Sequence, residues 1–414
     1  MRDEILSNLQ NPRQLEKLYR GNKTPFKREF SGLYPELKGN TLADYWHERL
    51  NYETDDISWG SRNELLFVAV ASLIAGILAK FPAIFGIEEE FFYPRNISFL
   101  VFPFLAAYFG WKNKLSLAKT ALLAGVVLVC LVYINSLPHN PNSDTLVLAC
   151  LHLPLLLWGV LGVSFAGNEF RDHRKRLDFL RFNGDLAVMA ALLVIAGVIM
   201  TGITIGLFSL IGFNIEKFYF EYVVAFGLPA VPIVATFLTQ TNPQLVNKVS
   251  PVIAKIFSPL VLVMLVIYLG AIIFSGKDPY NDREFLLLFN LLLIGVMALI
   301  FFSVAESSTK EKSTSALWVL LLLSIVTVVV NGIALSAISF RISEWGITPN
   351  RVAVLGGNVL ILVHLLLVTV MLFKAITKKA ATAEVGRAIA LYLPVYLIWT
   401  VLVVFVFPLV FGFK

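Results

Sequence analysis

Charged residues in one short stretch, residues 341–351 (RISEWGITPNR), could bind an anion. A helix beginning at Thr348 would direct its free backbone N–H groups and the positive end of its dipole toward the membrane surface, which favours a small anion or a lipid phosphate. Arg341 and Arg351 would supply positive charge, and Glu344 could pair with either. The alternative is a well-capped turn with interfacial arginines and a Trp345 anchor.

The order of residues in this stretch predicts a tight helical hairpin. Gly346 offers the left-handed conformation that ends helices, and Thr348 is a good N-cap because its hydroxyl can accept from a free backbone N–H. Pro349 falls at the first helical position, where its missing N–H costs nothing. We expect the two arginines to converge, with a Glu344 pairing or a bound anion between them. The candidate outer-surface site comprises Arg341, Glu344, Trp345, Thr348, Asn350 and Arg351.

The two apolar segments that flank this hairpin contain polar residues at membrane depth. Asn331, Asn358 and His364 form a candidate intramembrane polar site, since burying such groups without a partner is costly. Asn358 and His364 are six positions apart, so they do not share a tight helical face. A helix–helix hydrogen bond would explain each residue, and His364 could instead carry protons near neutral pH.

Other catalytic and metal-binding patterns are absent from the sequence. The five histidines show no metal-ligand spacing, and the two cysteines, Cys130 and Cys150, lie inside apolar runs without a Cys-x-x-Cys pattern. The chain also lacks a phosphate-binding glycine loop and a Gly-x-Ser-x-Gly elbow. We therefore predict no metal and no cofactor, and we find no catalytic motif that would make the chain an enzyme.

The composition is that of a membrane protein. Hydrophobic residues make up 57% of the chain and charged residues only 15%, and the mean hydropathy is +0.75. Ordinary soluble domains rarely depart this far from average usage. The net charge of +6 is explained by basic loops beside membrane spans, so we expect no nucleic-acid partner.

Long apolar runs predict an all-α, polytopic membrane protein with about eleven transmembrane helices. Residues 97–111 form a short run, so ten spans plus a re-entrant segment is the alternative. The predicted spans are residues 65–82, 97–111, 118–137, 145–166, 186–212, 222–239, 252–274, 285–305, 316–340, 352–375 and 389–411.

Lysine and arginine placement predicts the orientation. With a cytoplasmic N-terminus, the inner loops hold roughly twice as many basic residues as the outer loops, in agreement with the positive-inside rule. The basic run at residues 171–181 is the largest inner cluster, and it serves either as an orientation signal or as a contact for anionic lipid headgroups. Eleven spans then place the C-terminus and the hairpin outside.

The first part of the chain differs from the rest. Residues 1–63 form a soluble, cytoplasmic helical region with three short apolar stripes, and residues 64–414 form the transmembrane domain. The stripes need a surface to cover, so we expect them to pack on the cytoplasmic ends of the spans or on a protein partner. Membrane lipids are the other expected partners, and the oligomeric state is open.

Several blocks of sequence resemble a known family. The stretch FRISEWGITPNRVAVLGGNVLIL at residues 340–362 is similar to the signature of an uncharacterised bacterial family of multispan membrane proteins, domain of unknown function four-one-five-three. GLFSLIGF, GLPAVPIVATFL, LEKLYR and WHERL resemble the same family. The resemblance implies a location in the bacterial cytoplasmic membrane, and it implies no activity and no site residue.

Three classes of function follow from these features. Transport or lipid handling is favoured by many spans, broken helices and polar residues at membrane depth. A membrane scaffold or sensor would act through residues 1–63. A membrane enzyme acting on a lipid phosphate at the outer surface would depend on Arg341, Glu344 and Arg351. We rank transport or lipid handling first.

Overall fold

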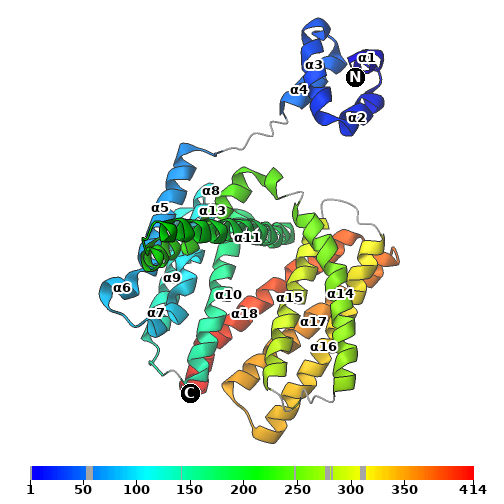
Figure 1. Cartoon of the computed structure of the whole chain (residues 1–414). Coiled ribbons are helices and arrows are strands. Elements are labelled where there is room, and N and C mark those ends of the chain that lie inside the picture. Colours follow the sequence, from blue (N-terminus) through cyan, green and yellow to red (C-terminus); the bar gives the residue numbers. More distant parts are fainter. Residues whose placement is uncertain are drawn as a thin grey trace. The chain divides into compact units, whose positions relative to one another are not determined.

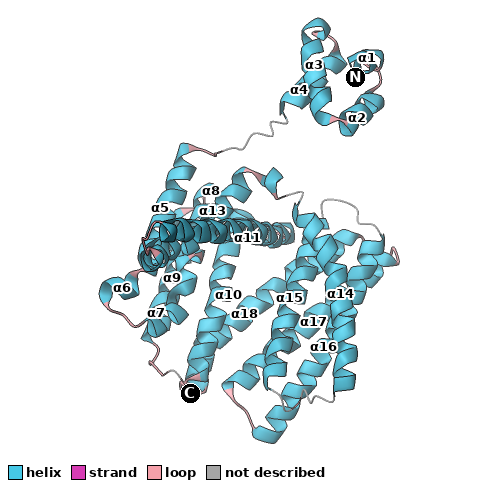
Figure 2. Cartoon of the chain, in the orientation of Figure 1, coloured by secondary structure: helices cyan, strands magenta, loops and turns pink. Residues whose placement is uncertain are grey.

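Helices form every regular element in the described part of the chain, as the composition predicted (Figure 1, Figure 2). The computed structural model describes residues 2–52, 59–140, 142–246, 249–275, 280, 283–307 and 314–414. The chain divides into two compact units, Met1–Trp59 and Gly60–Lys414. The division falls slightly before residue 63, because Ser61 already caps the first long apolar helix.

The first unit has its own hydrophobic core. Phe26, Phe30 and Trp46 are buried together, and ring contacts link Trp46 to both phenylalanines. The apolar stripes that we expected to cover other surfaces are thus buried against one another, because short connections let consecutive helices meet. Its helices are α1 (Arg2–Ser7), α2 (Pro12–Gly21), α3 (Lys23–Leu37) and α4 (Thr41–Tyr52).

The second unit begins with a group of helices around α10. Ser61 and Glu64 form a capping box at the start of α5, which fixes where this apolar helix begins. Buried side chains of α5, α8, α10 and α13 share one core. The elements are α5 (Arg62–Ala79), α6 (Phe81–Phe85), α7 (Glu89–Asn96), η1 (Ile97–Leu100), α8 (Phe102–Lys112), α9 (Leu117–Ser136) and α10 (Asp144–Ala166).

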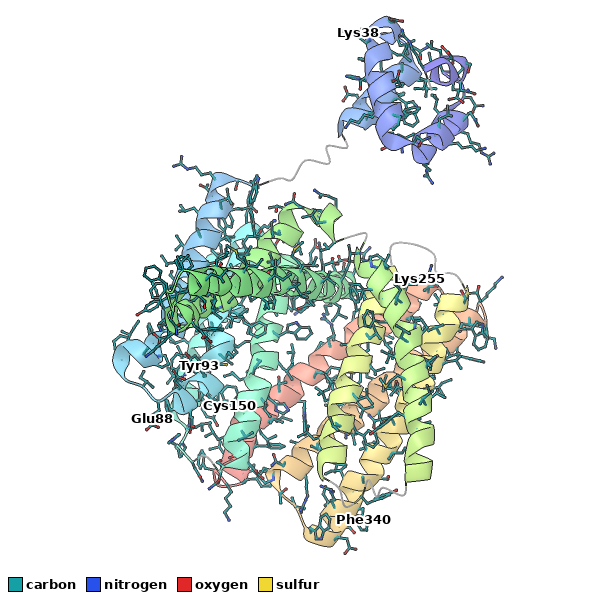
Figure 3. The ribbon with its side chains drawn as sticks, viewed as in Figure 1. Lys38, Glu88, Tyr93, Cys150, Lys255 and Phe340 are labelled. Carbon is teal, nitrogen blue, oxygen red and sulfur yellow. The ribbon has the colours of Figure 1, made fainter. Side chains whose placement is uncertain are left out.

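The short predicted span at residues 97–111 is part of a broken helical segment. Prolines at 94 and 103 interrupt it, and Val101, with φ −126° and ψ −63°, separates η1 from α8. Tyr93 of α7, which is labelled in Figure 3, donates from its hydroxyl to the carbonyl oxygen of Ala79, at the end of α5. Asn96 and Asn135 exchange side-chain hydrogen bonds between α7 and α9.

A long helix and a broken one follow. α11 begins in the basic loop and continues without interruption into an apolar half that is mostly exposed. α13 contains Pro229 and Pro232 and is preceded by the π-helical stretch η3. The elements are η2 (Gly167–Glu169), α11 (His173–Leu210), α12 (Glu216–Phe218), η3 (Tyr219–Val224), α13 (Ala225–Thr241) and η4 (Pro243–Leu245).

The last helices form a second bundle with a large hydrophobic core, which joins α14, α15, α16, α17 and α18. Figure 3 shows Lys255 of α14 and Phe340 of α16 at opposite ends of this bundle. The elements are α14 (Val249–Ser275), α15 (Arg283–Ser307), α16 (Thr314–Trp345), α17 (Pro349–Ile376), α18 (Thr382–Val401), the π-helical η5 (Leu402–Val406) and α19 (Phe407–Val410).

Hydrogen bonds at the two ends of α10 place the start of α5 and the C-terminus on opposite sides of this unit. Asn113, after α8, donates to carbonyl oxygens in the last turn of α10, and Lys112 pairs with Glu64 of α5 at 3.4 Å. At the other end, the N–H of Thr145 donates to the carbonyl oxygen of Lys414 (Figure 1). Since α10 has 23 residues, these ends are about 34 Å apart. We call them the start side and the tail side.

Ten helices in the described residues are long and apolar enough to cross a membrane. This finding fits a polytopic helical membrane protein. The ten correspond to the predicted spans, except that residues 97–111 do not qualify by themselves, because α8 has only 11 residues. The broken segment from α7 to α8 nevertheless connects the tail side to the start side, since Asn96 contacts the end of α9 and Lys112 the start of α5.

Candidate functional site

The hairpin turn has the cap geometry that the sequence predicted. Gly346 has a φ of +80°, and its N–H donates to the carbonyl oxygen of Ile342 at 2.9 Å, which closes α16. The hydroxyl of Thr348 accepts from the N–H of Arg351 at 3.3 Å, and Pro349 occupies the first turn of α17. The ends of α16 and α17 therefore meet in a short, fully specified turn.

The two arginines of the turn converge on Trp345 while their donors bind backbone oxygens. The guanidinium carbons of Arg341 and Arg351 lie 5.6 Å and 5.7 Å from the Trp345 ring centre. Nη1 of Arg351 donates to the carbonyl oxygens of Trp345 and Gly346, at 2.7 Å and 2.6 Å. Nε of Arg341, which is buried, donates to the carbonyl oxygen of Tyr280 at 2.8 Å.

Glu344 does not pair with either arginine in the described residues, which was one of the two arrangements that we expected. Its side chain is exposed, and it forms no ion pair within the described ranges. The carbonyl oxygens at the end of α16 satisfy Arg351 instead, because helix C-termini leave carbonyl groups without intrahelical donors. Asn350 is half-buried in the first turn of α17. The contacts favour the capped-turn interpretation over an anion site.

Two of the three candidate intramembrane residues meet, together with a third that the sequence analysis missed. Nδ2 of Asn331 on α16 donates to the carbonyl oxygen of Asn358 on α17 at 3.2 Å. Nδ2 of Asn358 donates to Oδ1 of Asn290 on α15 at 2.8 Å. Asn290 lies inside a predicted span, so its amide was the signal that could have found it. Three neighbouring helices are thus joined by amide hydrogen bonds in a buried, apolar setting.

His364 belongs to a different cluster. Its side chain is fully buried, and its Nδ1 lies 3.0 Å from the hydroxyl of Tyr396 on α18, which in turn donates to the sulfur of Met297 on α15. The rings of Phe301 and Tyr392 lie 4.5 Å and 4.4 Å from the imidazole. As the sequence spacing indicated, His364 and Asn358 use different neighbours. An aromatic surrounding favours the helix–helix contact over proton transfer.

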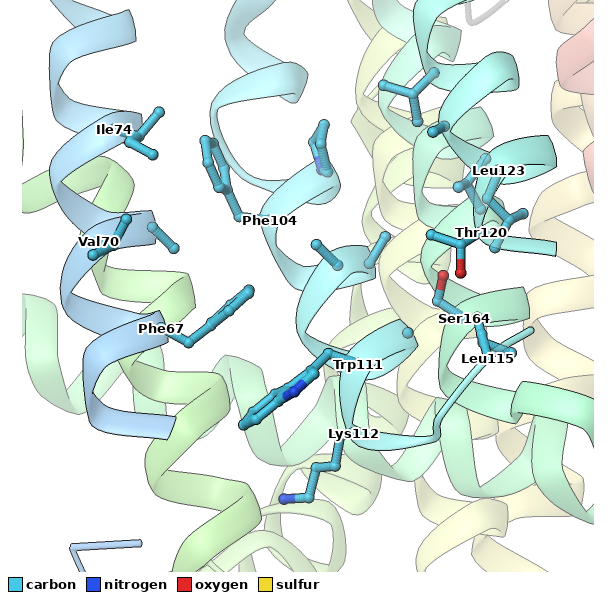
Figure 4. A pocket seen from close by; sticks show the side chains of 18 of the residues that line it. Phe67, Val70, Ile74, Phe104, Trp111, Lys112, Leu115, Thr120, Leu123 and Ser164 are labelled. Carbon is cyan, nitrogen blue, oxygen red and sulfur yellow. The ribbon is translucent and has the colours of Figure 1, made fainter. Parts of the chain in front are cut away.

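A groove between α5, α8 and α9 is a feature that the sequence analysis did not predict (Figure 4). Its volume is about 1420 Å³. Phe67, Val70 and Ile74 line it from α5, and α9, whose side chains are mostly exposed, forms the opposite wall. The floor includes Ala106 of α8 and Val160 and Ser164 of α10. The short α8, with 11 residues, lies between α5 and α9 along the groove (Figure 4).

Charged and aromatic side chains gather at the start-side end of this groove, which we call the groove mouth and define by Glu64, Tyr108, Trp111, Lys112 and Lys114. Oε1 of Glu64 accepts from the hydroxyl of Tyr108 at 3.3 Å and lies 3.4 Å from Nζ of Lys112. Trp111 stacks on Phe67, with ring centres 5.9 Å apart. Figure 4 shows Lys112 and Trp111 together at one end and Ile74 toward the other.

The basic residues at 171–181, most of them in the first turns of α11, pair mainly with nearby residues. Arg174 pairs with Asp172, and Lys175 pairs with Glu169. The backbone N–H of Arg174, which donates to Asp172 at 2.9 Å, holds the pKa of that carboxyl below its usual range. Arg181 donates to the carbonyl oxygen of Ala305 at 2.7 Å and so ties α11 to α15. These bonds fit a structural and orienting role for the cluster.

No group of three or more His, Cys, Asp or Glu side chains in the described part of the chain is placed to bind a metal ion.

Comparison with known proteins finds no relative: no family model, no curated protein and no solved structure matches this chain. The many apolar helices therefore define the class, a multispan helical membrane protein, and the groove is its most distinctive site.

Proposed function

We propose that this protein handles lipid, holding a membrane lipid in the groove between α5, α8 and α9. The observation that supports the proposal is the groove itself, whose volume exceeds the usual range of pockets for drug-sized ligands and whose walls are apolar. Apolar walls offer water no hydrogen-bond partners, so acyl chains are the natural occupant at membrane depth. The polar groups at the groove mouth suit the headgroup end of the same molecule.

Orientation and location belong to the same proposal. We place the start side in the cytoplasm and the tail side outside, because the basic loops gather on the start side. The broken segment from α7 to α8 then counts as an eleventh crossing. A bacterial cytoplasmic membrane, and membership of the uncharacterised family that residues 340–362 resemble, are further proposals that rest on sequence alone.

Filling the groove tests the proposed function. Ala107 of α8 and Ala124 of α9 both line the groove, whereas Ala121 of α9 is exposed and does not. The full chain, purified in mild detergent, should retain lipid that native mass spectrometry detects. Ala107→Trp and Ala124→Trp should abolish retention, and Ala121→Trp should leave it unchanged. Equal retention by all these proteins would count against lipid binding in the groove.

Transport through the second bundle is the second candidate. Oδ1 of Asn331 and Nε2 of His364 are buried acceptor atoms without a hydrogen-bond partner in the described residues. Intramembrane groups of this kind often mark substrate or ion paths. Substrate-dependent flux in proteoliposomes that is lost in Asn331→Leu, with groove-bound lipid retained, would favour transport over lipid handling.

A scaffold or sensor role draws support from the first unit alone. Residues Met1–Trp59 form a compact unit with a core of their own, as expected for a region that binds a protein partner. Co-purification of a partner that depends on this unit would favour this role. The enzyme alternative loses its main support, because Arg351 binds the backbone and Glu344 pairs with neither arginine.

A further inference from the structure

The groove mouth carries one positive charge that no described residue neutralises. Lys112 is paired with Glu64, whose carboxylate also accepts from Tyr108 and from the N–H of Ser61. Lys114 also lines the groove, and its side chain is exposed without a hydrogen bond or ion pair to any residue that the structure describes. The mouth therefore has an excess of positive charge beside apolar walls.

Lys114 is held at this position by the turn that follows α8. The N–H of Leu115 donates to the carbonyl oxygen of Gly110 at 2.9 Å, and Lys114 has a φ of +50°. Glycine is the usual residue at this place in a helix-ending turn, because it has no Cβ to resist a positive φ. Asn113 anchors the turn to the end of α10 through two hydrogen bonds. The ammonium group thus projects from a fixed backbone.

Lys378 has the same backbone conformation as Lys114 but lies outside the groove. Lys378, after α17, has a φ of +56°, and the N–H of Lys379 donates to the carbonyl oxygen of Lys374 in the same type of turn. Lys378 does not line the groove. The unusual conformation is therefore not evidence of a site in itself, but Lys378 provides a matched control for Lys114.

Charge and shape together point to one occupant. We propose that the groove selects a phospholipid with a net negative headgroup from the start-side leaflet, with the headgroup phosphate at Lys114 and the acyl chains along Phe67, Ile74 and Leu123. This inference rests on the proposed lipid-handling function and adds its selectivity. Lys112 contributes less to headgroup binding, because its Nζ is paired with Oε1 of Glu64 at 3.4 Å. Lipid phosphates attract basic side chains at the membrane surface, and net anionic lipids attract them most.

The test compares two lipids with identical acyl chains. Native mass spectrometry on the full chain in detergent should show tighter binding of phosphatidylglycerol than of phosphatidylcholine. Lys114→Gln should weaken phosphatidylglycerol binding about five-fold, as expected for the loss of one basic residue at a membrane surface. It should weaken phosphatidylcholine binding by less, because the choline of that lipid offsets the charge of its phosphate. Lys378→Gln should change neither. Inorganic phosphate, which lacks acyl chains, should not displace the bound lipid.

A second variant acts in the opposite direction. Glu64→Gln keeps the capping box, since glutamine also serves at that position, but removes the negative charge that holds Lys112. It should strengthen phosphatidylglycerol binding more than phosphatidylcholine binding, because only phosphatidylglycerol has a net negative headgroup. A merely structural role for these residues would not produce opposite effects in the two variants.

The outcomes separate this inference from the proposed function. Equal binding of the two lipids by the native protein, or equal losses in Lys114→Gln and Lys378→Gln, would overturn the selectivity while lipid binding in the groove stood. An equal weakening of both lipids in Lys114→Gln would also overturn it. Failure to retain any lipid, with Ala107→Trp indistinguishable from the native chain, would overturn both.

Discussion

The absence of a Cβ at Gly356 allows two helices of the second bundle, α17 and α18, to approach closely. A Cβ added at Gly356 would lie 2.1 Å from the ring of Trp399 on α18, whereas a Cβ at the neighbouring Gly357 would meet nothing within 4 Å. Trp399 has little freedom to move, because its ring packs edge-on against Phe407 at 5.8 Å. Of these two adjacent glycines, only Gly356 therefore lies where α17 and α18 approach closely.

This difference makes a paired prediction. Gly356→Ala should destabilise the protein by about 1–3 kcal/mol through overpacking against Trp399. Gly357→Ala should be neutral or slightly stabilising, because alanine favours the helix and has open space. Thermal unfolding of the two purified variants in the same detergent measures the contrast. Equal effects would show that α17 and α18 do not approach at Gly356.

Arg351 offers a second prediction at the scale of one residue. Arg351→Ala removes two charge-assisted hydrogen bonds to the end of α16 and should cost about 1.5–3 kcal/mol. Lipid retention should be unchanged, because the hairpin lies away from the groove lining. Glu344→Ala, at an exposed position, should change neither quantity. A loss of bound lipid without a loss of stability would restore the anion-site interpretation of the hairpin.

Among the elements, α2 connects to α4 through one carboxylate. Glu16 accepts from Arg20 at 2.7 Å and pairs with Arg49 of α4 at 2.9 Å. Arg49 also lies over the Trp46 ring, 4.8 Å from its centre. The hydrogen bond from Arg20, with the charge of Arg49, lowers the pKa of Glu16 below its ordinary value of 4.5. This ion pair therefore joins the surface of the first unit to its aromatic core.

The lowered pKa predicts how this unit responds to acid. A carboxyl with a lowered folded-state pKa contributes stability above its unfolded pKa, and this contribution is lost as the pH falls through the folded value. Amide protection factors for residues 2–52 should therefore fall below pH 4.5. The effect should be less than about 1 kcal/mol, since exposed ion pairs are weak.

Two variants show whether Glu16 is responsible for this acid response. Glu16→Gln should lower protection at neutral pH and flatten the change below pH 4.5. Glu36→Gln, which removes an exposed partner of Arg2, serves as the control and should leave the change in place. An acid response that is identical in Glu16→Gln and the native chain would assign it to other groups.

At the scale of the whole molecule, the two ends of α10 make a topological prediction. The start of α5 and the C-terminus lie at opposite ends of this helix, so reporters at Asn63 and Lys414 should report opposite sides of the membrane. Reporter fusions at Asn63, Asn142, Lys175 and Lys414 should give cytoplasmic signals only at Asn63 and Lys175. A cytoplasmic signal at Lys414 would remove the crossing from α7 to α8 and leave ten spans.

Local sequence signals determined a large part of this protein. Long apolar runs defined the helices, because a helix of about twenty apolar residues is needed to satisfy the backbone across a bilayer. The caps at Gly346 and Thr348 could also be predicted, since they depend on residues within one turn. The broken second span was visible as a short run, and its prolines explain why it breaks.

Only the tertiary structure decided which groups meet. Asn290 as the partner of Asn358, Tyr396 as the partner of His364, and the backbone oxygens that bind Arg351 all come from elements whose pairing is not encoded locally. The groove between α5, α8 and α9 was equally hidden from the sequence. The physical reason is that lipid and helix neighbours are both apolar, so an apolar pattern does not distinguish the face that packs from the face that meets the membrane.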